Sequence, residues 1–441
     1  MNRLFTPQGP VTDCRLGGEV YDGDIMEMPE RKELLGLVPT ATYGDHLPQE
    51  GERGGALHLS SILPALSSAI GHPVPTAVHD DPKSLQHALG FPDVRSAIVV
   101  LVDGLGFWNL TDRIGHAPYL RSLMKDEANR RPISTCAPST TTAAMGTFGT
   151  GTCPGLTAMA GYTQLAPARD RLIQLIQFKD PLAPKTNGPV VPIIDPHDLQ
   201  RQDTIFEALT AQGVRVTSSG LAKFKGSPLS EAALRGSKYI ANVTPRERVR
   251  AAAEAARKPG LSYLYIRDAD KVGHSSGWDS DKWIAAFEHI DAQLALLARE
   301  APKGTLIVIT ADHGMVNADP SKRIDIACEP VLQQGVRFVG GEPRAVMLYA
   351  DDNPEAVAER WRDFLEDRAL VRTKAQAMAD GLFGTVSERV EPMLGDVIVQ
   401  AVDEVTIVDS RTQADKATHL PSVHGSQTMM EMDIPCIVDV A

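Results

Sequence analysis

Cysteine is scarce in this 441-residue chain, and the five that occur are far apart. The odd number includes no Cys-X-X-Cys pair; the residues are Cys14, Cys136, Cys153, Cys328 and Cys436. This pattern is typical of reduced thiols in the cytosol rather than of a disulfide framework. It predicts a cytoplasmic location.

Long apolar runs and an excess of positive charge are also missing. No segment approaches the roughly 18 consecutive apolar residues of a membrane-spanning helix, and the N-terminal MNRLFTPQGPVTDC lacks the apolar core of a signal peptide. Lys and Arg number 44 against 56 Asp and Glu, for a net charge of −12. A nucleic acid partner is therefore not expected, because phosphate polymers need a basic surface. A small anionic substrate is still compatible, since a bound cation can reverse the local field.

The composition that remains is that of a large globular protein, with 43% hydrophobic and 23% charged residues. Residues 1–54 are rich in Pro, Gly and acidic residues, which predicts an irregular N-terminal extension. Residues 55–441 would form the main domain. Within it, residues 152–200 contain several prolines and a single helical patch, RDRLIQLIQF at 169–178. We expect this part to be an inserted cap or lid above the fold.

Apolar strand-like runs alternate with helical segments along the main domain. The run SAIVVLVDG at 96–104 is short, β-branched and apolar throughout, as is typical of a buried parallel strand. Further strands are predicted over 213–220, 261–270, 304–314, 344–350 and 396–402, and helices over 59–71, 204–212, 245–257 and 283–300. The alternation predicts an α/β fold with a mostly parallel central sheet and helices on both faces.

Acidic residues follow three of these strands: Asp103, Asp270 and Asp312. An acidic residue at a strand end often only caps the next turn. In open α/β sheets, however, ligands bind at the carboxyl ends of the strands. Three carboxylates at one such edge would repel each other unless cations were bound between them.

Three histidines accompany the acids. His313 directly follows Asp312, and His274 comes four residues after Asp270. His424 lies near the C-terminus, in the segment VHGSQTMMEMD. Imidazole and carboxylate together are the ligand set of zinc or a similar divalent metal, so zinc is favoured, with Mn²⁺ and Mg²⁺ as alternatives.

The set of motifs resembles the alkaline phosphatase superfamily, and within it the type I phosphodiesterase/nucleotide pyrophosphatase branch. The resemblance extends over residues 95–441 and rests on DGLG at 103–106, the Thr cluster ending in TG at 150–151, DKVGHSSG at 270–277, ADHGM at 311–315 and HGS at 424–426. It implies an alkaline phosphatase-like fold, two divalent metal ions and a small phosphorylated substrate.

The resemblance also implies how the metal ligands are divided. One site would consist of Asp103, Asp312, His313 and the oxygen of the nucleophile, and the other of Asp270, His274 and His424. Each set leaves one position open, as a catalytic zinc requires. Two cations roughly 4 Å apart can hold the attacking and leaving oxygens of an in-line phosphoryl displacement.

The stretch CAPSTTT at 136–142 contains several potential nucleophiles. In the family, the nucleophile starts a helix ten residues before the Gly of the TG pair, which implies Thr141. Free backbone N–H groups at a helix start bind phosphoryl oxygen, so Thr142 is expected to contribute its N–H. Coordination to a metal would activate the threonine hydroxyl.

The cysteine in this stretch is a competing nucleophile. Cys136 with the following Ala-Pro resembles the formylglycine sequence of sulfatases. That motif needs an Arg two residues after the Pro, where this chain has Thr140. Cys136 is therefore predicted to be a buried structural thiol.

Two positions depart from the family pattern. Family phosphodiesterases carry an Asn three residues after the nucleophile and a His shortly after the TG pair, and this chain has Ala144 and Thr157 there. Losing one oxyanion donor costs about 10²–10³ in rate in other enzymes. Replacement donors suggested by the sequence are Lys223, Lys225, Arg267 and Lys271.

These observations favour a two-metal hydrolase of phosphate esters, of the phosphodiesterase or nucleotide pyrophosphatase type, with a phosphothreonyl intermediate on Thr141. A phosphomonoesterase or a phosphonate hydrolase of the same superfamily is the nearest alternative. A metal-binding scaffold without turnover is an alternative of another class, because Ala144 replaces the family Asn. The sequence does not indicate an oligomeric state.

Overall fold

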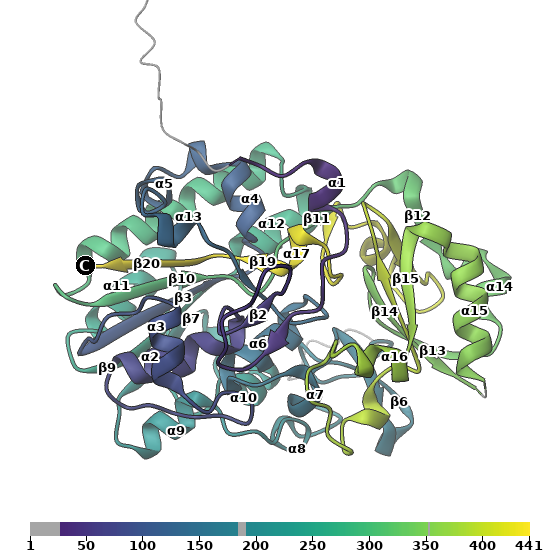
Figure 1. The fold of residues 1–441 in the computed structure, drawn as a ribbon, viewed down its shortest axis with the longest axis horizontal. Helices are drawn as coiled ribbons and strands as arrows, with labels where there is room; N and C mark the ends of the chain where they lie inside the picture. Colours follow the sequence, from purple (N-terminus) through teal and green to yellow (C-terminus); the bar gives the residue numbers. More distant parts are fainter. Residues whose placement is uncertain (1–26, 184–190, 352) are drawn as a thin grey trace, which may run out of the picture.

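The computed structural model describes residues 27–183, 191–351 and 353–441. Its centre is a six-stranded sheet in the order β20-β10-β3-β9-β7-β8 (Figure 1). The strands are β3 (Ser96–Val102), β7 (Val216–Gly220), β8 (Lys238–Ala241), β9 (Gly260–Ile266), β10 (Leu306–Thr310) and β20 (Cys436–Val440). Five of them are parallel, and β20 pairs antiparallel with β10 at the edge. The mostly parallel sheet predicted from the sequence is therefore confirmed.

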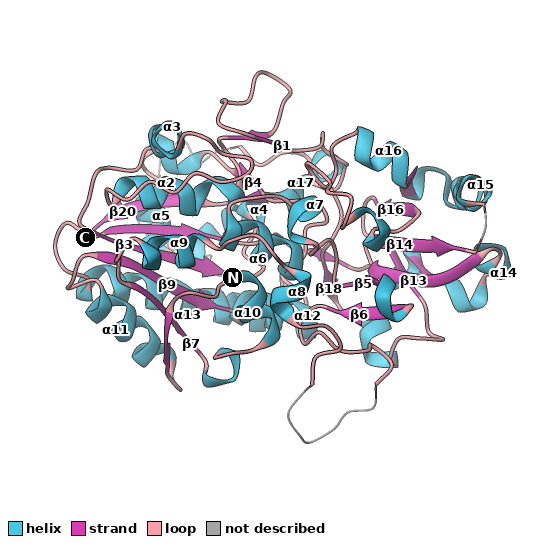
Figure 2. Cartoon of the chain, turned by 90° about the horizontal axis from the view of Figure 1, so that it is seen from below, coloured by secondary structure: helices cyan, strands magenta, loops and turns pink. Residues whose placement is uncertain are grey.

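Helices cover both faces of this sheet. In Figures 1 and 2, α2 (Ile62–Ala69) and α3 (Pro82–Ala88) lie on one side, and α11 (Pro245–Ala255) and α13 (Asp281–Glu300) on the other. Because both faces are covered, every residue of β3 is buried. This explains why the strand is apolar at every position instead of alternating.

Two of the predicted strands lie outside the central sheet. Segments 344–350 and 396–402 form β14 (Ala345–Ala350) and β16 (Val397–Ala401) of a separate antiparallel sheet, in the order β13-β14-β16-β15. Its other strands are β13 (Val336–Glu342) and β15 (Ala369–Thr373).

This second sheet is also buried on two faces, which is why its strands resemble those of a parallel sheet. Val346 and Leu348 of β14 pack in one hydrophobic cluster with α15 (Pro354–Leu365). Met347 and Tyr349 point the other way, into a different cluster. A strand covered on both sides is apolar throughout, whichever sheet it joins.

The helix predicted in RDRLIQLIQF is wrong. The segment forms β6 (Arg171–Gln174), which pairs antiparallel with β5 (Thr163–Ala166). The hairpin is held against the second sheet, where the Tyr349 hydroxyl accepts a hydrogen bond from the Leu165 N–H at 2.8 Å. Tertiary packing thus overrides the local helical pattern. The role of residues 152–200 as a cap stays a prediction.

Half of the predicted N-terminal extension, residues 1–26, lies outside the described residues. Residues 27–54 lie across the main fold with little regular structure beyond α1 (Arg31–Leu34) and β1 (Thr42–Tyr43). Leu34 packs against Phe107 and Met430. The Val38 N–H donates to the Gln427 carbonyl at 2.8 Å, just past the predicted ligand His424.

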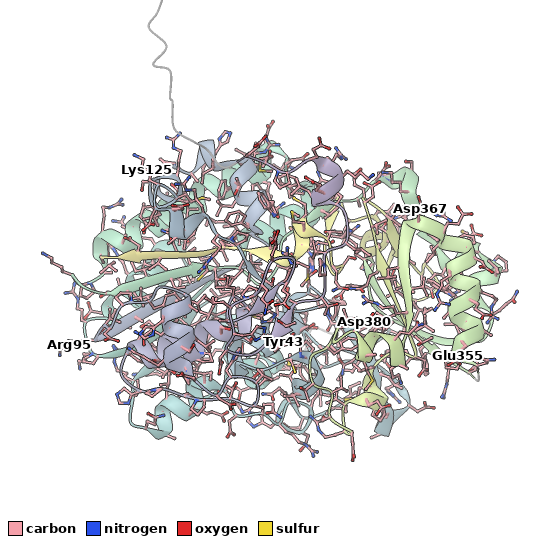
Figure 3. The ribbon with its side chains drawn as sticks, in the orientation of Figure 1. Tyr43, Arg95, Lys125, Glu355, Asp367 and Asp380 are labelled. Carbon is pink, nitrogen blue, oxygen red and sulfur yellow. The ribbon has the colours of Figure 1, made fainter. Side chains whose placement is uncertain are left out.

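Charged side chains such as Lys125, Glu355 and Asp367 project outward from the surface of the molecule (Figure 3). Among the residues that the structure describes, no helix combines the length and apolar character needed to cross a membrane.

Candidate active site

The three strand-end acids meet at one edge of the central sheet. Asp103 follows β3, Asp312 follows β10, and Asp270 lies on α12 (Asp268–Ser276), which begins directly after β9. The Gly104 N–H donates to Asp312 Oδ1 at 3.0 Å, and the Asp270 N–H donates to the Asp103 carbonyl at 3.0 Å. Gly104 has φ of +71°, and a Cβ there would lie 2.8 Å from the Asp270 Cβ. Only glycine therefore lets these two turns approach so closely.

His313 lies at the centre of the cluster. Its Nε2 is 3.7 Å from Asp103 Oδ1 and 3.6 Å from Asp312 Oδ2. Its ring stacks on that of His424, with centroids 3.6 Å apart. Potential ligand atoms of Asp103, Asp312 and His313 all lie within 4.8 Å of one another, as the first implied metal site requires.

The second implied ligand set also lies together. His274 Nε2 is 3.1 Å, and His424 Nε2 3.7 Å, from Asp270 Oδ1. The Nδ1 of His274 is 2.7 Å from the Ser422 carbonyl, and that of His424 is 2.9 Å from the Ser139 carbonyl. A carbonyl at Nδ1 favours the proton on that nitrogen and leaves Nε2 free to bind a metal.

Thr141 completes the cluster as the first residue of α6 (Thr141–Thr150). Its Oγ1 lies 3.2 Å from His313 Nε2. Thr140 forms the N-cap in an extended conformation, so the helix begins at the metal-ligand candidates. The first N–H groups of a helix, which include that of Thr142, have no partner within the helix and attract anions.

Burial makes the charged forms of two carboxylates of this cluster, Asp103 and Asp312, unfavourable without a cation. The pKa of Asp103 is raised well above its usual value by burial and by the nearby Asp312 and Asp270 carboxylates. Burial likewise raises the pKa of Asp312. One oxygen of each acid is buried without a hydrogen-bond partner among the described residues: Asp103 Oδ1, Asp270 Oδ1 and Asp312 Oδ2. These orphaned oxygens fit divalent cations, which would satisfy and neutralise them.

The pKa values of His274 and His424 are shifted in opposite directions. Although burial opposes it, the Asp270 carboxylate raises the pKa of His274, and that histidine in turn helps lower the pKa of Asp270. His424 behaves in the opposite way, because burial and the neighbouring His313 and His274 hold its pKa well below the usual range. A histidine that stays neutral near pH 7 is ready to bind a metal.

The positions that depart from the family pattern offer nothing polar to the cluster. Ala144 is fully buried in the main core, and the Thr157 hydroxyl is directed to the Pro154 carbonyl at 3.4 Å. Cys136 is also fully buried, and burial raises the pKa of its thiol to about 12. Such a thiol is unreactive, which supports its structural role.

Two residues at the site have no signal in the sequence. The Tyr265 hydroxyl, on β9, donates a hydrogen bond to Asp103 Oδ2. Glu342, at the end of β13, is buried beside Gly425 and accepts a hydrogen bond from the Tyr162 N–H at 3.2 Å. Burial raises the pKa of Glu342 to about 8. Neither residue belongs to a motif. Each lies on a strand whose position beside the site is set by the tertiary fold.

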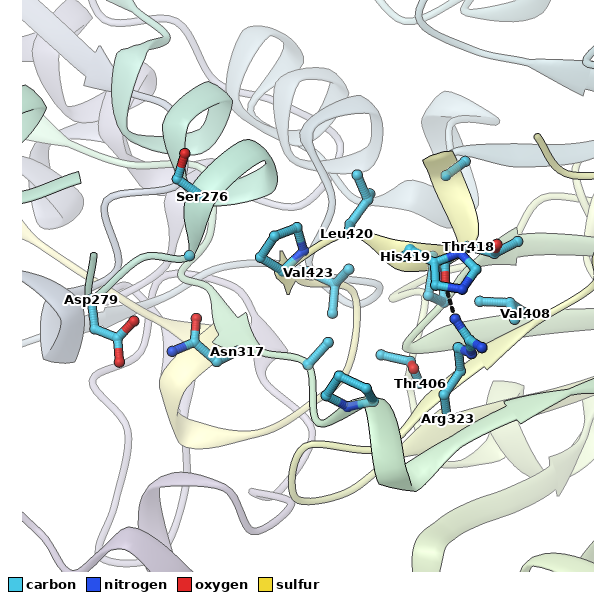
Figure 4. A pocket seen from close by; sticks show the side chains of 16 residues that line it. Ser276, Asp279, Asn317, Arg323, Thr406, Val408, Thr418, His419, Leu420 and Val423 are labelled. Carbon is cyan, nitrogen blue, oxygen red and sulfur yellow. Dashed lines mark hydrogen bonds between the residues drawn. The ribbon is translucent and has the colours of Figure 1, made fainter. Parts of the chain in front are cut away.

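A pocket of about 420 Å³ adjoins the site but contains none of the predicted ligands (Figure 4). It extends from Ser276, near the end of α12, past Asn317 to His419. Arg323 lines one end of it and donates from Nη1 to the Thr418 carbonyl at 3.3 Å. It therefore lies beside the cluster rather than in it.

The seven predicted metal-ligand residues, Thr141 among them, thus lie together at one edge of the sheet, while their roles as ligands and nucleophile stay predictions. The fold is shared with solved structures. Murine ectonucleotide pyrophosphatase/phosphodiesterase 5 superposes with a TM-score of 0.61 at 16% identity, over 78% of this chain and 87% of the murine chain. An inactive variant of that murine protein was solved in complex with AMP.

A second similar structure is phosphonoacetate hydrolase from Sinorhizobium meliloti 1021 in complex with phosphonoformate. It superposes with a TM-score of 0.58 at 20% identity, over 79% of this chain and 90% of the hydrolase. At these identities the likeness shows the fold.

The family is shown by sequence. No curated protein matches the chain significantly. The family model of type I phosphodiesterase / nucleotide pyrophosphatase, however, matches residues 97–427. That range includes the seven clustered residues and most of the central sheet. The chain therefore belongs to the type I phosphodiesterase / nucleotide pyrophosphatase family, whose members are metal-dependent hydrolases of phosphoric esters.

Proposed function

We propose that this protein hydrolyses phosphate esters with two divalent metal ions, through a phosphothreonyl intermediate on Thr141. The observation that carries the proposal is the position of the Thr141 hydroxyl. It lies at a helix N-terminus, 3.2 Å from His313 Nε2, within a cluster of buried carboxylates and histidines. A buried structural threonine would not need three acids with orphaned oxygens beside it.

Asp103, Asp312, His313 and Thr141 would hold one ion, and Asp270, His274 and His424 the other. When bound, such ions lower the pKa of a coordinated hydroxyl and offset phosphoryl charge. Zinc fits the mixed Asp and His ligands best, with Mn²⁺ and Mg²⁺ as alternatives.

The chain's own residues perform the transfer in two steps. Thr141 Oγ1 forms a bond to phosphorus while the bond to the leaving oxygen breaks, and backbone N–H groups at the start of α6 hold a phosphoryl oxygen. The proton that the Thr141 hydroxyl loses balances the one that the leaving oxygen gains, so the leaving group departs protonated. Water then cleaves the bond between Oγ1 and phosphorus, which releases the phosphoryl product and restores the hydroxyl.

Three classes of substrate are candidates for this reaction. Family membership supports a diester or pyrophosphate, in keeping with the AMP bound by the murine relative. Ala144 in place of the family Asn weakens that assignment and keeps a phosphomonoester or a phosphonate as alternatives. An inert metal-binding scaffold is the candidate of another class. A cytoplasmic location and a cap formed by residues 152–200 belong to the same proposal.

The proposal is tested by turnover of bis-p-nitrophenyl phosphate, p-nitrophenyl phosphate and a phosphonate on one zinc-loaded preparation. Thr141→Ala should retain its zinc and lose activity by at least about a thousandfold, because it removes the nucleophile. Asp312→Ala should lose both zinc and activity. Thr141→Ser, which keeps a hydroxyl, is the matched control and should retain measurable turnover. Full activity in Thr141→Ala would exclude the mechanism, and zinc binding without turnover of any ester would favour the inert scaffold.

A further inference from the structure

Thr140, the residue before the proposed nucleophile, does not use its side chain to cap α6. It is the N-cap of the helix, with the extended backbone (φ −135°, ψ 146°) of an ordinary cap. A threonine at this position usually accepts a hydrogen bond from the second or third N–H of the helix. In this protein the Thr140 side chain forms no such bond. Its hydroxyl oxygen is buried, so solvent does not satisfy it either.

The N–H groups that such a cap would occupy are therefore free. The first hydrogen bond of the helix joins the Ala144 N–H to the Thr140 carbonyl at 2.9 Å. The Thr142 and Ala143 N–H groups come before it and, within residues 27–183, 191–351 and 353–441, donate to no carbonyl or side chain. These are the groups that the proposed mechanism assigns to a phosphoryl oxygen.

The Glu342 carboxyl group is held beside Thr140 by the segment that carries His424. Glu342 comes from the end of β13. A Cβ at Gly425 would lie 2.6 Å from the Glu342 Cγ, so the two residues are in close contact. The Gly425 carbonyl in turn accepts a hydrogen bond from the Ser139 N–H at 3.0 Å. These contacts place Glu342 next to the segment that directly precedes α6.

A second set of contacts holds the same carboxyl group from the side of the helix. Glu342 Oε2 accepts from the Tyr162 N–H at 3.2 Å, and the neighbouring Gly161 carbonyl accepts from the Thr142 hydroxyl at 2.7 Å. The carboxyl group is thus held between residues that are bonded to either side of Thr140. At this place the Thr140 hydroxyl acts on it and partly offsets the burial that raises the pKa of Glu342.

The two side chains can satisfy each other. Thr140 Oγ1 and Glu342 Oε1 are both buried, and neither bonds to any other group that the structure describes. A buried polar atom without a partner is unfavourable. A hydroxyl can donate to a carboxylate or accept from a carboxylic acid, so the pair can form in either protonation state of Glu342. Without Glu342, the donors left to the Thr140 hydroxyl are the free N–H groups of the first turn.

We propose that Glu342 is a positioning residue that acts through Thr140. It holds the Thr140 hydroxyl away from the first turn of α6 and so keeps the Thr142 and Ala143 N–H groups open for the phosphoryl group. This inference rests on the proposed function, because it takes the start of α6 as the phosphoryl site. It requires a hydrogen-bonding side chain at position 342, whichever class of ester is the substrate.

Binding of inorganic phosphate to zinc-loaded protein tests the inference without turnover. The parent protein and every variant carry Thr141→Ala, which removes the proposed nucleophile and keeps the backbone N–H groups. Glu342→Ala should weaken phosphate binding by about tenfold or more, because the released Thr140 hydroxyl occupies an N–H that would otherwise bond to a charged oxygen. Isothermal titration calorimetry measures the affinity. Unchanged zinc content and a cooperative melting transition show that the variant is folded.

A second substitution separates this role from a purely structural one. Glu342→Ala/Thr140→Val has no hydroxyl to occupy the first turn, so it should bind phosphate as tightly as the parent. A packing defect left by the shorter alanine side chain would persist in this double variant. Thr140→Val alone should also match the parent. Glu342→Gln is the matched control, since its amide can still bond to the Thr140 hydroxyl and should preserve the affinity.

The outcomes separate this inference from the proposed function. Unchanged binding in Glu342→Ala, weak binding that persists in the double variant, or weak binding in Thr140→Val alone overturns the inference even if esters are hydrolysed. A parent protein that binds no phosphate overturns it as well. Binding that is lost in Glu342→Ala and restored in the double variant supports it, even if the zinc-loaded wild type hydrolyses no ester.

Discussion

At the scale of single residues, Glu342 is a buried carboxyl group that joins three segments beside Thr140, the residue before Thr141. It accepts from Tyr162 and lies against Gly425, while its Oε1 has no hydrogen-bond partner among the described residues. Burial is the main cause of its raised pKa of about 8, and the nearby Glu431 acts in the same direction. The folded protein therefore holds a proton here that the unfolded chain releases at the ordinary pKa of 4.5.

This difference predicts that stability falls as pH rises from about 4.5 to about 8. Over that window Glu342 should contribute a loss of up to about 1.4 kcal/mol per pH unit in the free energy of unfolding. Glu342→Gln removes this titration. The free energy of unfolding of the variant, relative to that of the wild type, should therefore increase as pH rises. Urea unfolding of chelator-treated protein near pH 5.5 and about 7.5 measures this. Glu355→Gln, at an exposed position, is the control. If Glu342→Gln and the wild type differ in stability by the same amount at both pH values, the prediction is contradicted.

At the scale of elements, α6 is the helix that presents Thr141, and its position depends on a close approach to α10 (Pro228–Ala233). The point of approach is Gly149, where a Cβ would lie 1.7 Å from the Ala233 carbonyl oxygen. No side chain fits there unless one helix moves. The glycine thus sets where the helix that begins with Thr141 lies.

Gly149→Ala should therefore destabilise the protein by about 1–3 kcal/mol, although alanine is the better helix former. It should also reduce turnover, because a displaced α6 moves Thr141 away from His313. Gly115→Ala is the control, since a Cβ there would meet no atom within 4 Å and the backbone does not have positive φ. Denaturant unfolding of both variants measures this difference. Equal free energies of unfolding would contradict the prediction, because α6 would then accommodate the added Cβ without strain.

At the scale of the whole molecule, one buried ion pair connects the second sheet to the site. Arg344, just before β14, donates from Nε and Nη2 to Glu431 at 2.8 and 2.9 Å, and both side chains are fully buried. Glu431, on α17 (Met429–Met432), also accepts from the Ser426 N–H at 3.0 Å, two residues after His424. The second sheet thus helps position a predicted metal ligand.

Arg344→Met should destabilise the protein by about 3–5 kcal/mol, because it leaves Glu431 charged and buried without its partner. It should also weaken zinc retention through His424. The double variant Arg344→Met/Glu431→Gln should recover part of the stability, since no unpaired charge remains. A double-mutant cycle by urea unfolding measures the coupling. Additive effects of the two substitutions would contradict the role given to the pair.

Much of the fold and the candidate site follows from local pattern. The apolar runs that became β3, β9 and β10 could be recognised because strands covered on both faces have no polar positions. Their acids could be assigned to one edge because parallel neighbouring strands all end on the same side. Thr141 came from the family spacing, and the structure places its hydroxyl beside His313.

Other features depend on contacts between segments far apart in the chain. Apolar character alone could not assign β14 and β16 to a separate antiparallel sheet, since burial on two faces looks the same in either sheet. The helical pattern at 169–178 became a hairpin because packing against the second sheet outweighs local propensity. The contacts of Glu342 and Tyr265 at the site arise where strands meet, and side-chain proximity of that kind leaves no periodic trace in the sequence. Local chemistry thus predicted which acids, histidines and threonine form the candidate site, while long-range packing decided which other side chains surround them.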